Sequence, residues 1–269
     1  MTKTFLTAAI TFKEGIRNKV IHGIVILGIL LFAGNIVLTG MFSWELGKVA
    51  VDMGLSVISL AGLIIIFFLG INSLANDLER KTVYLILSRP ITRVHYLLGK
   101  YLGLAALVIA SSVILGVLAA VSVKVSIYGS GGYMPAGFSW VTFAAGIVYQ
   151  TLSLLIVLAL SVLWGTIASN SFTALLLSVI TYFVGQNLEN VANIISASKL
   201  MAGNTALIKT IEWLSWIFPN LAAFDLKTTA AYGLAIDGWY LALTAVYGLT
   251  YIGAALILAT LVFNRRELA

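Results

Sequence analysis

Long apolar runs with few or no charged residues alternate with polar connections along this 269-residue chain. Most of these runs are long enough, at about 1.5 Å per helical residue, to cross roughly 30 Å of hydrocarbon. Backbone groups inside hydrocarbon need hydrogen-bond partners within their own segment, so we expect each run to be a helix. The pattern predicts an all-α polytopic membrane protein with six transmembrane helices, at Val20–Thr39, Met53–Leu74, Leu97–Val123, Val141–Ala168, Ser171–Asn187 and Trp239–Phe263.

The fifth run is short and its end is polar. It finishes in Gln186 and Asn187, so a re-entrant segment is the alternative to a full span there. The long connection Leu188–Gly238 then leads to the sixth run and contains an apolar stretch around Leu207–Phe218 that stops at Pro219. Because that stretch is too short to cross the bilayer, we expect it to dip into the outer interface or to pack on the spans.

Residues 1–19 are predicted to form an amphipathic helix on the cytoplasmic side of the membrane. Phe5, Ala9, Phe12 and Ile16 recur at i, i+4, i+7 and i+11, which places them on one face of a helix. Such a helix lies in the membrane interface, and a simple basic anchor is the alternative. Residues 20–269 then form a single six-span transmembrane domain.

The composition agrees with a membrane protein and excludes an ordinary soluble enzyme. Only 10% of the residues are charged, where a soluble domain carries about 25%. Hydrophobic residues make up 61% of the chain and cysteine is absent, so neither a disulfide framework nor a thiolate metal site can form. The net charge of +6 comes from basic residues beside apolar spans, which suits anionic lipid headgroups rather than nucleic acid.

The basic residues also predict the orientation. Eleven of them fall on one side of the predicted topology, around the N-terminal segment, the connection 75–96 and the C-terminus, and five fall on the other side. Since Lys and Arg accumulate in cytoplasmic connections, both termini and the loop 75–96 are expected to be cytoplasmic.

The titratable residues argue against two classes of membrane protein. The chain has two histidines, His22 and His95, at no metal-ligand spacing, and all ten carboxylates fall outside the six predicted spans. A membrane enzyme gathers such groups in one place, and an ion-coupled transporter keeps them at bilayer depth. Both classes are therefore disfavoured.

Energy from ATP would need a second protein. A phosphate-binding loop requires Gly-Lys followed by Ser or Thr, but Gly47-Lys48 precedes Val49 and Gly99-Lys100 precedes Tyr101. ATP and its magnesium ion would therefore bind to a separate subunit, and no cofactor is expected on this chain. The loop around residues 79–93 is the largest cytoplasmic element on which such a subunit could act.

That loop resembles the type-2 ABC transporter permeases, the membrane subunits of a large class of exporters. The likeness lies in Glu79-Arg80-Lys81-Thr82, in Leu85-Ile-Leu-Ser-Arg-Pro-Ile-Thr-Arg93 and in Leu97-Leu-Gly-Lys100. Lys81-Thr82 departs from the Gly-Thr pair that is common in the family. Phe12–Lys19 is similar to the connecting helix before the first span, and Phe218–Leu221 to a turn before the last span. Within the family the chain looks closest to the branch with the nitrous oxide reductase maturation permease.

The resemblance implies a function as well as a fold. A coupling helix over Asp77–Ser88 would sit in a groove on a separate ABC ATPase, and closure of the ATPase dimer would move the second and third spans. A solvated basic loop without a partner is the alternative. Six spans make half a transporter, so a homodimer or a pairing with a similar permease is implied, in a bacterial or archaeal inner membrane. The implied ATPase-coupling residues are Glu79, Arg80, Lys81, Thr82, Pro90 and Arg93.

The fifth run carries a polar stripe. Ser178, Tyr182 and Gln186 recur at i, i+4 and i+8, so their side chains stack on one helical face. The stripe either makes hydrogen bonds within one subunit or lines the exit of a substrate path at the dimer axis, and Ser56 and Ser59 on the second span are the alternative lining.

These observations leave two functions open. The first is the permease subunit of an ATP-driven exporter. The second is a non-transporting membrane module that relays ATPase-driven motion to an outer-face partner protein, with Leu188–Gly238 as the docking surface.

The topology is testable because the chain has no cysteine of its own. The distribution of basic residues places Gly129–Gly132 outside the cell. A single cysteine introduced at Ser130 should therefore react with a membrane-impermeant thiol reagent on intact cells. Reaction only after the cells are broken would reverse the assigned orientation.

Overall fold

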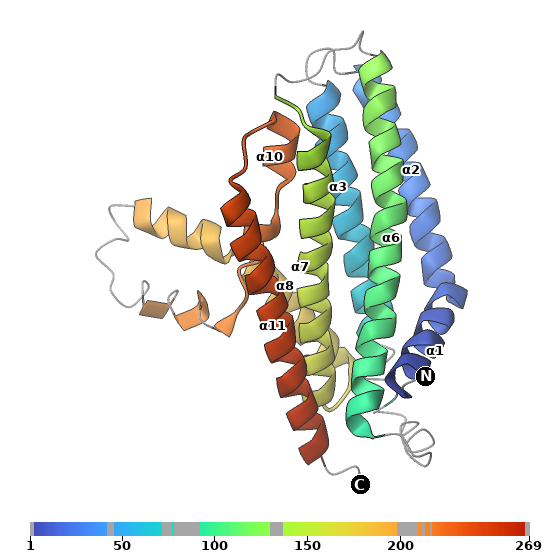
Figure 1. Cartoon of the computed structure of the whole chain (residues 1–269), viewed down its shortest axis with the longest axis vertical. Coiled ribbons are helices and arrows are strands. Elements are labelled where there is room, and N and C mark those ends of the chain that lie inside the picture. Colours follow the sequence, from blue (N-terminus) through green and yellow to red (C-terminus); the bar gives the residue numbers. More distant parts are fainter. Residues whose placement is uncertain are drawn as a thin grey trace.

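The structure is a computed structural model that describes residues 3–41, 46–71, 77, 92–129, 137–197, 209–210, 213–215 and 217–266. All regular structure in these residues is helical, which confirms the predicted all-α fold for this part of the chain. Figure 1 shows one elongated bundle. Its long helices are α2 (Lys19–Met41), α3 (Leu46–Ile64), α6 (Arg93–Gly129), α7 (Trp140–Ile167), α8 (Ser171–Ala197) and α11 (Gly238–Arg265).

The long helices coincide with the predicted runs. Five segments among the described residues are long and apolar enough to cross a membrane. A sixth is added if α1 (Lys3–Arg17) and residues Ile21–Gly34, which are bent by 59° relative to each other, count as one span. The chain is therefore a multi-pass membrane protein with five or six candidate spans, and the count of six stays a prediction.

Two helices extend beyond the ends of the predicted spans. α8 continues without a break to Ala197, because buried Leu188 prolongs its packed face and Asn187 Nδ2 donates to the Phe183 carbonyl (2.9 Å) within the helix. The helical spans also reach beyond the uncharged windows, so that Asp52 lies on α3 and Glu189 on α8. Both carboxylates are exposed, and the Glu189 carboxylate accepts a hydrogen bond from Asn220 Nδ2 (2.9 Å).

α6 and α7 form the centre of the bundle. α7 has the highest buried share of the candidate spans, and its stretch from Ile156 to Leu163 is buried without interruption. α3, α6, α8 and α11 all pack on α7, and α2 reaches the bundle through α3 and α6. Since few side chains of α8 and α11 are buried, these two helices form the open flank of the bundle.

The second span passes from an α-helix into a π-helix. α3 passes directly into a π-helix, η1 (Ile65–Gly70), where each turn is wider than in an α-helix. The buried positions of η1 include Ile65, Ile66 and Gly70, so the widened turn faces the core. One ring on the same segment, Phe67, meets Tyr182 of α8 edge to face at 6.4 Å between centroids. The π-helix thus lies where the second and fifth spans meet.

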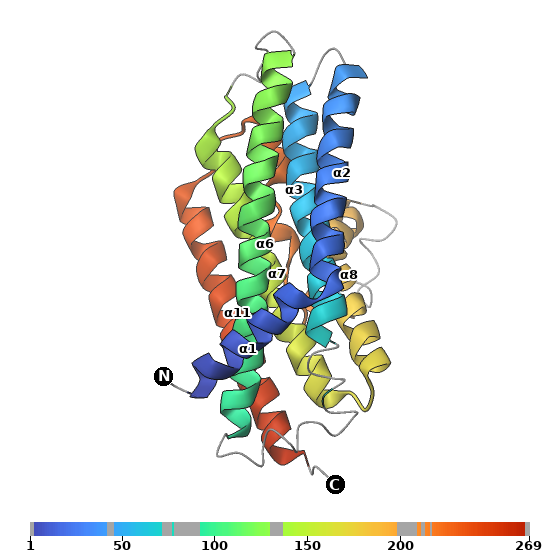
Figure 2. The same cartoon turned by 90° about the vertical axis from the view of Figure 1, so that its right-hand side faces the viewer.

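α1 crosses α6 near the lower end of the bundle in Figure 2. Its buried positions are the small residues Thr7, Thr11 and Gly15. On α6, Gly99 and Gly103 lie against this face of α1. A Cβ atom on Gly103 would lie 2.6 Å from the Ala8 carbonyl oxygen, so the two backbones touch. Small residues on both sides allow this approach.

The apolar side chains predicted to form one face of α1 point mainly away from the bundle. Phe5 and Ile16 are exposed at 56% and 46%, and Phe12 is half-buried. This leaves an apolar surface on α1 opposite its contact with α6, and the interfacial position of the helix remains a prediction.

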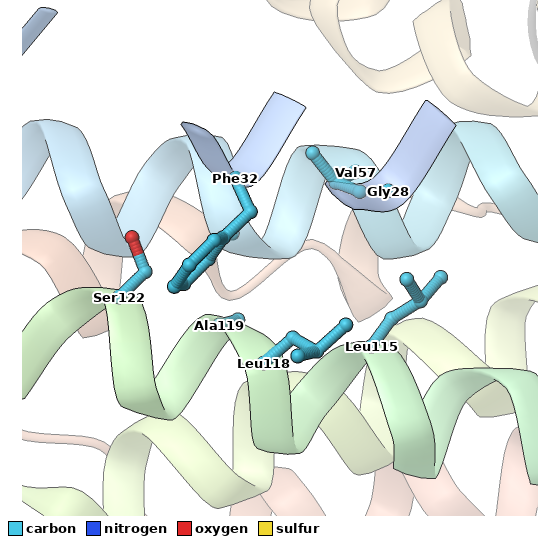
Figure 3. A pocket seen from close by; sticks show the side chains of 8 residues that line it. Gly28, Phe32, Val57, Leu115, Leu118, Ala119 and Ser122 are labelled. Atoms are coloured by element: carbon cyan, nitrogen blue, oxygen red, sulfur yellow. The ribbon is translucent and has the colours of Figure 1, made fainter. Parts of the chain in front are cut away.

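A niche between α2, α3 and α6 has a volume of only about 20 Å³ (Figure 3). Gly28, Phe32 and Leu115 are among its lining residues, and Ser122 supplies a hydroxyl group. A niche of this size has room for about one water molecule. It therefore marks close packing of three helices rather than a chamber for a substrate.

The α1–α6 contact makes a first structural prediction. Gly103→Ala should lower the free energy of unfolding by about 1–3 kcal/mol, because the added methyl group collides with the backbone of α1. Gly253→Ala on α11 is the matched control, since a Cβ atom there meets nothing within 4 Å. Thermal unfolding in detergent compares the two variants, and equal midpoints would contradict the close contact.

Candidate functional site

Arg93 ties the start of α6 to the end of α11. Its Nη1 donates to the carbonyls of Phe263 (2.9 Å) and Arg266 (2.8 Å). The last carbonyls of a helix have no partner within the helix, so a guanidinium at this point satisfies them and also opposes the negative end of the helix dipole.

Arg266 makes the corresponding contact with α7. Its Nη1 donates to the carbonyl of Thr166 (2.8 Å), in the last turn of that helix. One end of the bundle therefore joins the start of α6 with the ends of α7 and α11 through two arginine side chains. We call Arg93, Arg266 and the carbonyls that they bind the base network.

A buried ion pair lies beside the base network. The Asp77 carboxylate, on the described residue between the second span and α6, accepts a hydrogen bond from Tyr96 Oη (2.7 Å) and pairs with Lys100 Nζ (2.9 Å), both at Oδ2. Tyr96 is fully buried and Lys100 is 6% exposed. Tyr96 also packs against Phe263 at 6.3 Å between ring centroids, which connects the ion pair to α11.

Of the predicted coupling residues, only Arg93 lies in the described part of the chain. Glu79, Arg80, Lys81, Thr82 and Pro90 fall outside it. The guanidinium of Arg93 is engaged with carbonyls of α11, so it holds the end of the loop against the bundle.

Sequence reasoning did not find the ion pair. It counted Lys100 only as a basic residue that sets the topology, and Asp77 only as the start of a helix. The available signal was Tyr96 and Lys100 at i and i+4, which puts their polar ends on one face of α6.

The polar stripe of α8 is buried at one of its three positions and half-buried at the other two. Ser178 is buried and its Oγ donates to the Ala174 carbonyl (2.8 Å) within α8. Tyr182 is half-buried against the second span, where its ring meets Phe67 and the Ser59 hydroxyl lies near its own. Gln186 is half-buried one turn further on. These contacts favour hydrogen bonding and packing within one subunit for Ser178, while Tyr182 brings the two proposed pathway linings together.

The segment before α11 returns to the bundle and packs against the middle of α8. Leu221 N donates to the Gly185 carbonyl (3.0 Å), and a Cβ atom on Gly185 would lie 2.6 Å from the Pro219 carbonyl oxygen. The buried Phe224 ring, in the short helix η2 (Ala222–Phe224), stacks near Tyr247 at 6.1 Å. The helix α10 (Lys227–Tyr232) that follows packs on α3 and α7.

The residues that the structure describes hold no group of three His, Asp or Glu side chains placed to bind a metal ion. The polar groups gather instead at helix ends and at the returning segment. These polar contacts hold the helices against one another.

A known protein family matches almost the whole chain. A family model described as "ABC-2 family transporter protein" matches residues 7–268, which includes the base network, the polar stripe and the returning segment. No curated protein matches the chain.

Arg93 is open to a direct test. Arg93→Ala should lower the free energy of unfolding by about 1–3 kcal/mol, because carbonyls at the end of α11 lose their donor. Hydrogen–deuterium exchange should rise in the last turn of α11. Arg265→Ala, an exposed neighbour in that turn, is the control and should change neither quantity. Equal effects of both substitutions would show that the guanidinium does not cap α11.

Proposed function

We propose, from the fact that the chain belongs to the ABC-2 family of transporter proteins, that it is the permease subunit of an exporter driven by a separate ABC ATPase. Membership of this family makes the chain a transport protein of the membrane rather than an enzyme, and permeases of this family typically work with an ATPase subunit. The match over residues 7–268 is the observation that carries the proposal.

The proposed ATPase-docking element is the loop between the second span and α6. Its charged residues Glu79, Arg80 and Lys81, with Thr82 and Pro90, would contact a groove on the ATPase. Arg93 supports this by anchoring the end of the loop to α11. The base of the bundle and both termini would then face the cytoplasm of a bacterial or archaeal cell.

The proposed transporter contains two such chains or one chain with a similar permease. The family supports an assembly, because six spans would make half a transporter of this class. Tyr182 and Gln186 on α8 would line the path between the subunits, whereas Ser59 on the second span is buried within the chain. The burial of Ser178 makes it a positioning group for α8 in this arrangement.

Two finer assignments belong to the same proposal. The branch closest to the chain would be the one with the nitrous oxide reductase maturation permease. In the alternative function, the chain does not transport a substrate. It passes the movement driven by the ATPase to a partner protein that would bind Leu188–Gly238 on the outer face. The returning segment supports this alternative, because its contacts with α8 would change when that helix moves.

Charge reversal at the docking loop tests the proposed function. Glu79→Lys should keep normal expression but weaken the co-purification of an ABC ATPase and its permease-stimulated hydrolysis by about tenfold or more, because an interfacial like-charge contact costs far more than an exposed charge contributes to folding. Asp52→Lys, an exposed reversal on α3, is the control. Absence of any co-purifying ATPase from the wild-type chain would refute the proposal.

A further inference from the structure

The ion pair of Asp77 and Lys100 is the most deeply buried charged contact in the described part of the base. The Lys100 side chain is 7% exposed and the Asp77 side chain is 27% exposed. Removing an ammonium group from water costs free energy that only a well-placed anion and further hydrogen bonds recover. The Tyr96 hydroxyl donates to the same carboxylate oxygen that Lys100 contacts, so this environment holds Asp77 in one position.

Asp77 is attached to one helix at two points. Tyr96 and Lys100 are one turn apart on α6, and both polar ends meet at Oδ2 of Asp77. The Lys100 ammonium also lies 5.8 Å from the centre of the Tyr96 ring. A displacement of Asp77 along the bundle therefore pulls on the first two turns of α6.

Those turns of α6 are attached to two further helices. Gly99 touches α1, since a Cβ atom there would lie 2.5 Å from Thr7 Cβ. On another side, Tyr96 packs on Phe263 and Arg93 caps α11. α1, the start of α6 and the end of α11 consequently form one packed unit.

In the sequence, Asp77 lies two residues before Glu79, at the start of the proposed docking loop. We propose that the Asp77–Lys100 pair is the positioning link that transmits the movement of this loop to α6, and through α6 to α1 and α11. This inference rests on the proposed function, because an ATPase must supply the movement. It goes further by naming the residues through which the movement enters the bundle.

The link acts without touching ATP or the transported molecule. An ion pair in a low dielectric is stiff, because separating its charges inside protein costs more than separating them in water. Loss of either charge should leave the docking surface in place and break the path from the loop to α6. Docking and coupling should then separate in one variant, whereas general unfolding would remove both.

The experiment uses the complete chain with its co-purified ATPase, reconstituted in lipid nanodiscs. Hydrogen–deuterium exchange is compared with and without magnesium ATP and vanadate, which hold the ATPase closed. In the wild-type complex we expect a nucleotide-dependent change both in the loop 77–92 and in the first turns of α6. In Asp77→Asn the loop should still respond, while the response of α6 and the permease-stimulated ATP hydrolysis should fall by about tenfold, within the usual range of coupling between sites.

Three further variants separate the link from a purely structural role. Lys100→Met should reproduce Asp77→Asn, and the charge-swapped Asp77→Lys/Lys100→Asp should restore the response of α6. Asp52→Asn, which removes an exposed carboxylate from α3, should behave as the wild type. If Asp77→Asn does not fold, the charge-swapped protein decides the question, because it keeps both charges buried together.

The outcomes distinguish this inference from the proposed function. A response of α6 that persists in Asp77→Asn, or that is absent from a folded charge-swapped protein, overturns the inference and leaves the proposed function standing. A wild-type chain that binds no ATPase overturns the proposed function and the inference with it.

Discussion

Hydrocarbon offers no hydrogen-bond partner to a peptide group, and the structure of this chain depends on that constraint. Within the spans the helix itself satisfies the backbone, so the spans are continuous helices. At the helix ends the last carbonyls need donors from elsewhere, and Arg93 and Arg266 provide them for α11 and α7. The same arginines join these helices to each other, so satisfying the backbone also determines which helices meet at the base.

α6 links the parts of the bundle that are far apart in the sequence. It touches α1 through Gly99 and Gly103, α11 through Tyr96, and the start of the docking loop through Lys100. Small residues let backbones approach without a hydrophobic driving force, which lipid does not supply between helices. A helix held so closely on several sides moves with its neighbours, which suits the proposed role of α6 beside an ATPase.

The sequence predicted the class of the molecule better than its internal contacts. The all-α fold and the family-level resemblance of the loop are confirmed, because both depend on local patterns: uncharged runs and the order of short motifs. The span ends were less predictable. Asn187, for example, lies within α8, and its side chain donates a hydrogen bond to the Phe183 carbonyl of the same helix. The coupling roles of Glu79–Thr82, Pro90 and Arg93 stay predictions. The polar stripe lies on one helix, α8, but its periodicity did not indicate what Ser178 and Tyr182 would meet.

The sequence by itself determined that this chain enters a membrane, which segments are candidate spans and which family it resembles. Each of these follows from the hydropathy or the order of residues close together in the chain. Only the tertiary structure decided that Asp77 pairs with Lys100, that α1 packs through Thr7 and Thr11 rather than through its aromatic residues, and that the second span widens into a π-helix. These features depend on which helix faces which. In a chain of almost uniformly apolar spans, that choice is made by shape and by a few polar groups rather than by a repeating pattern.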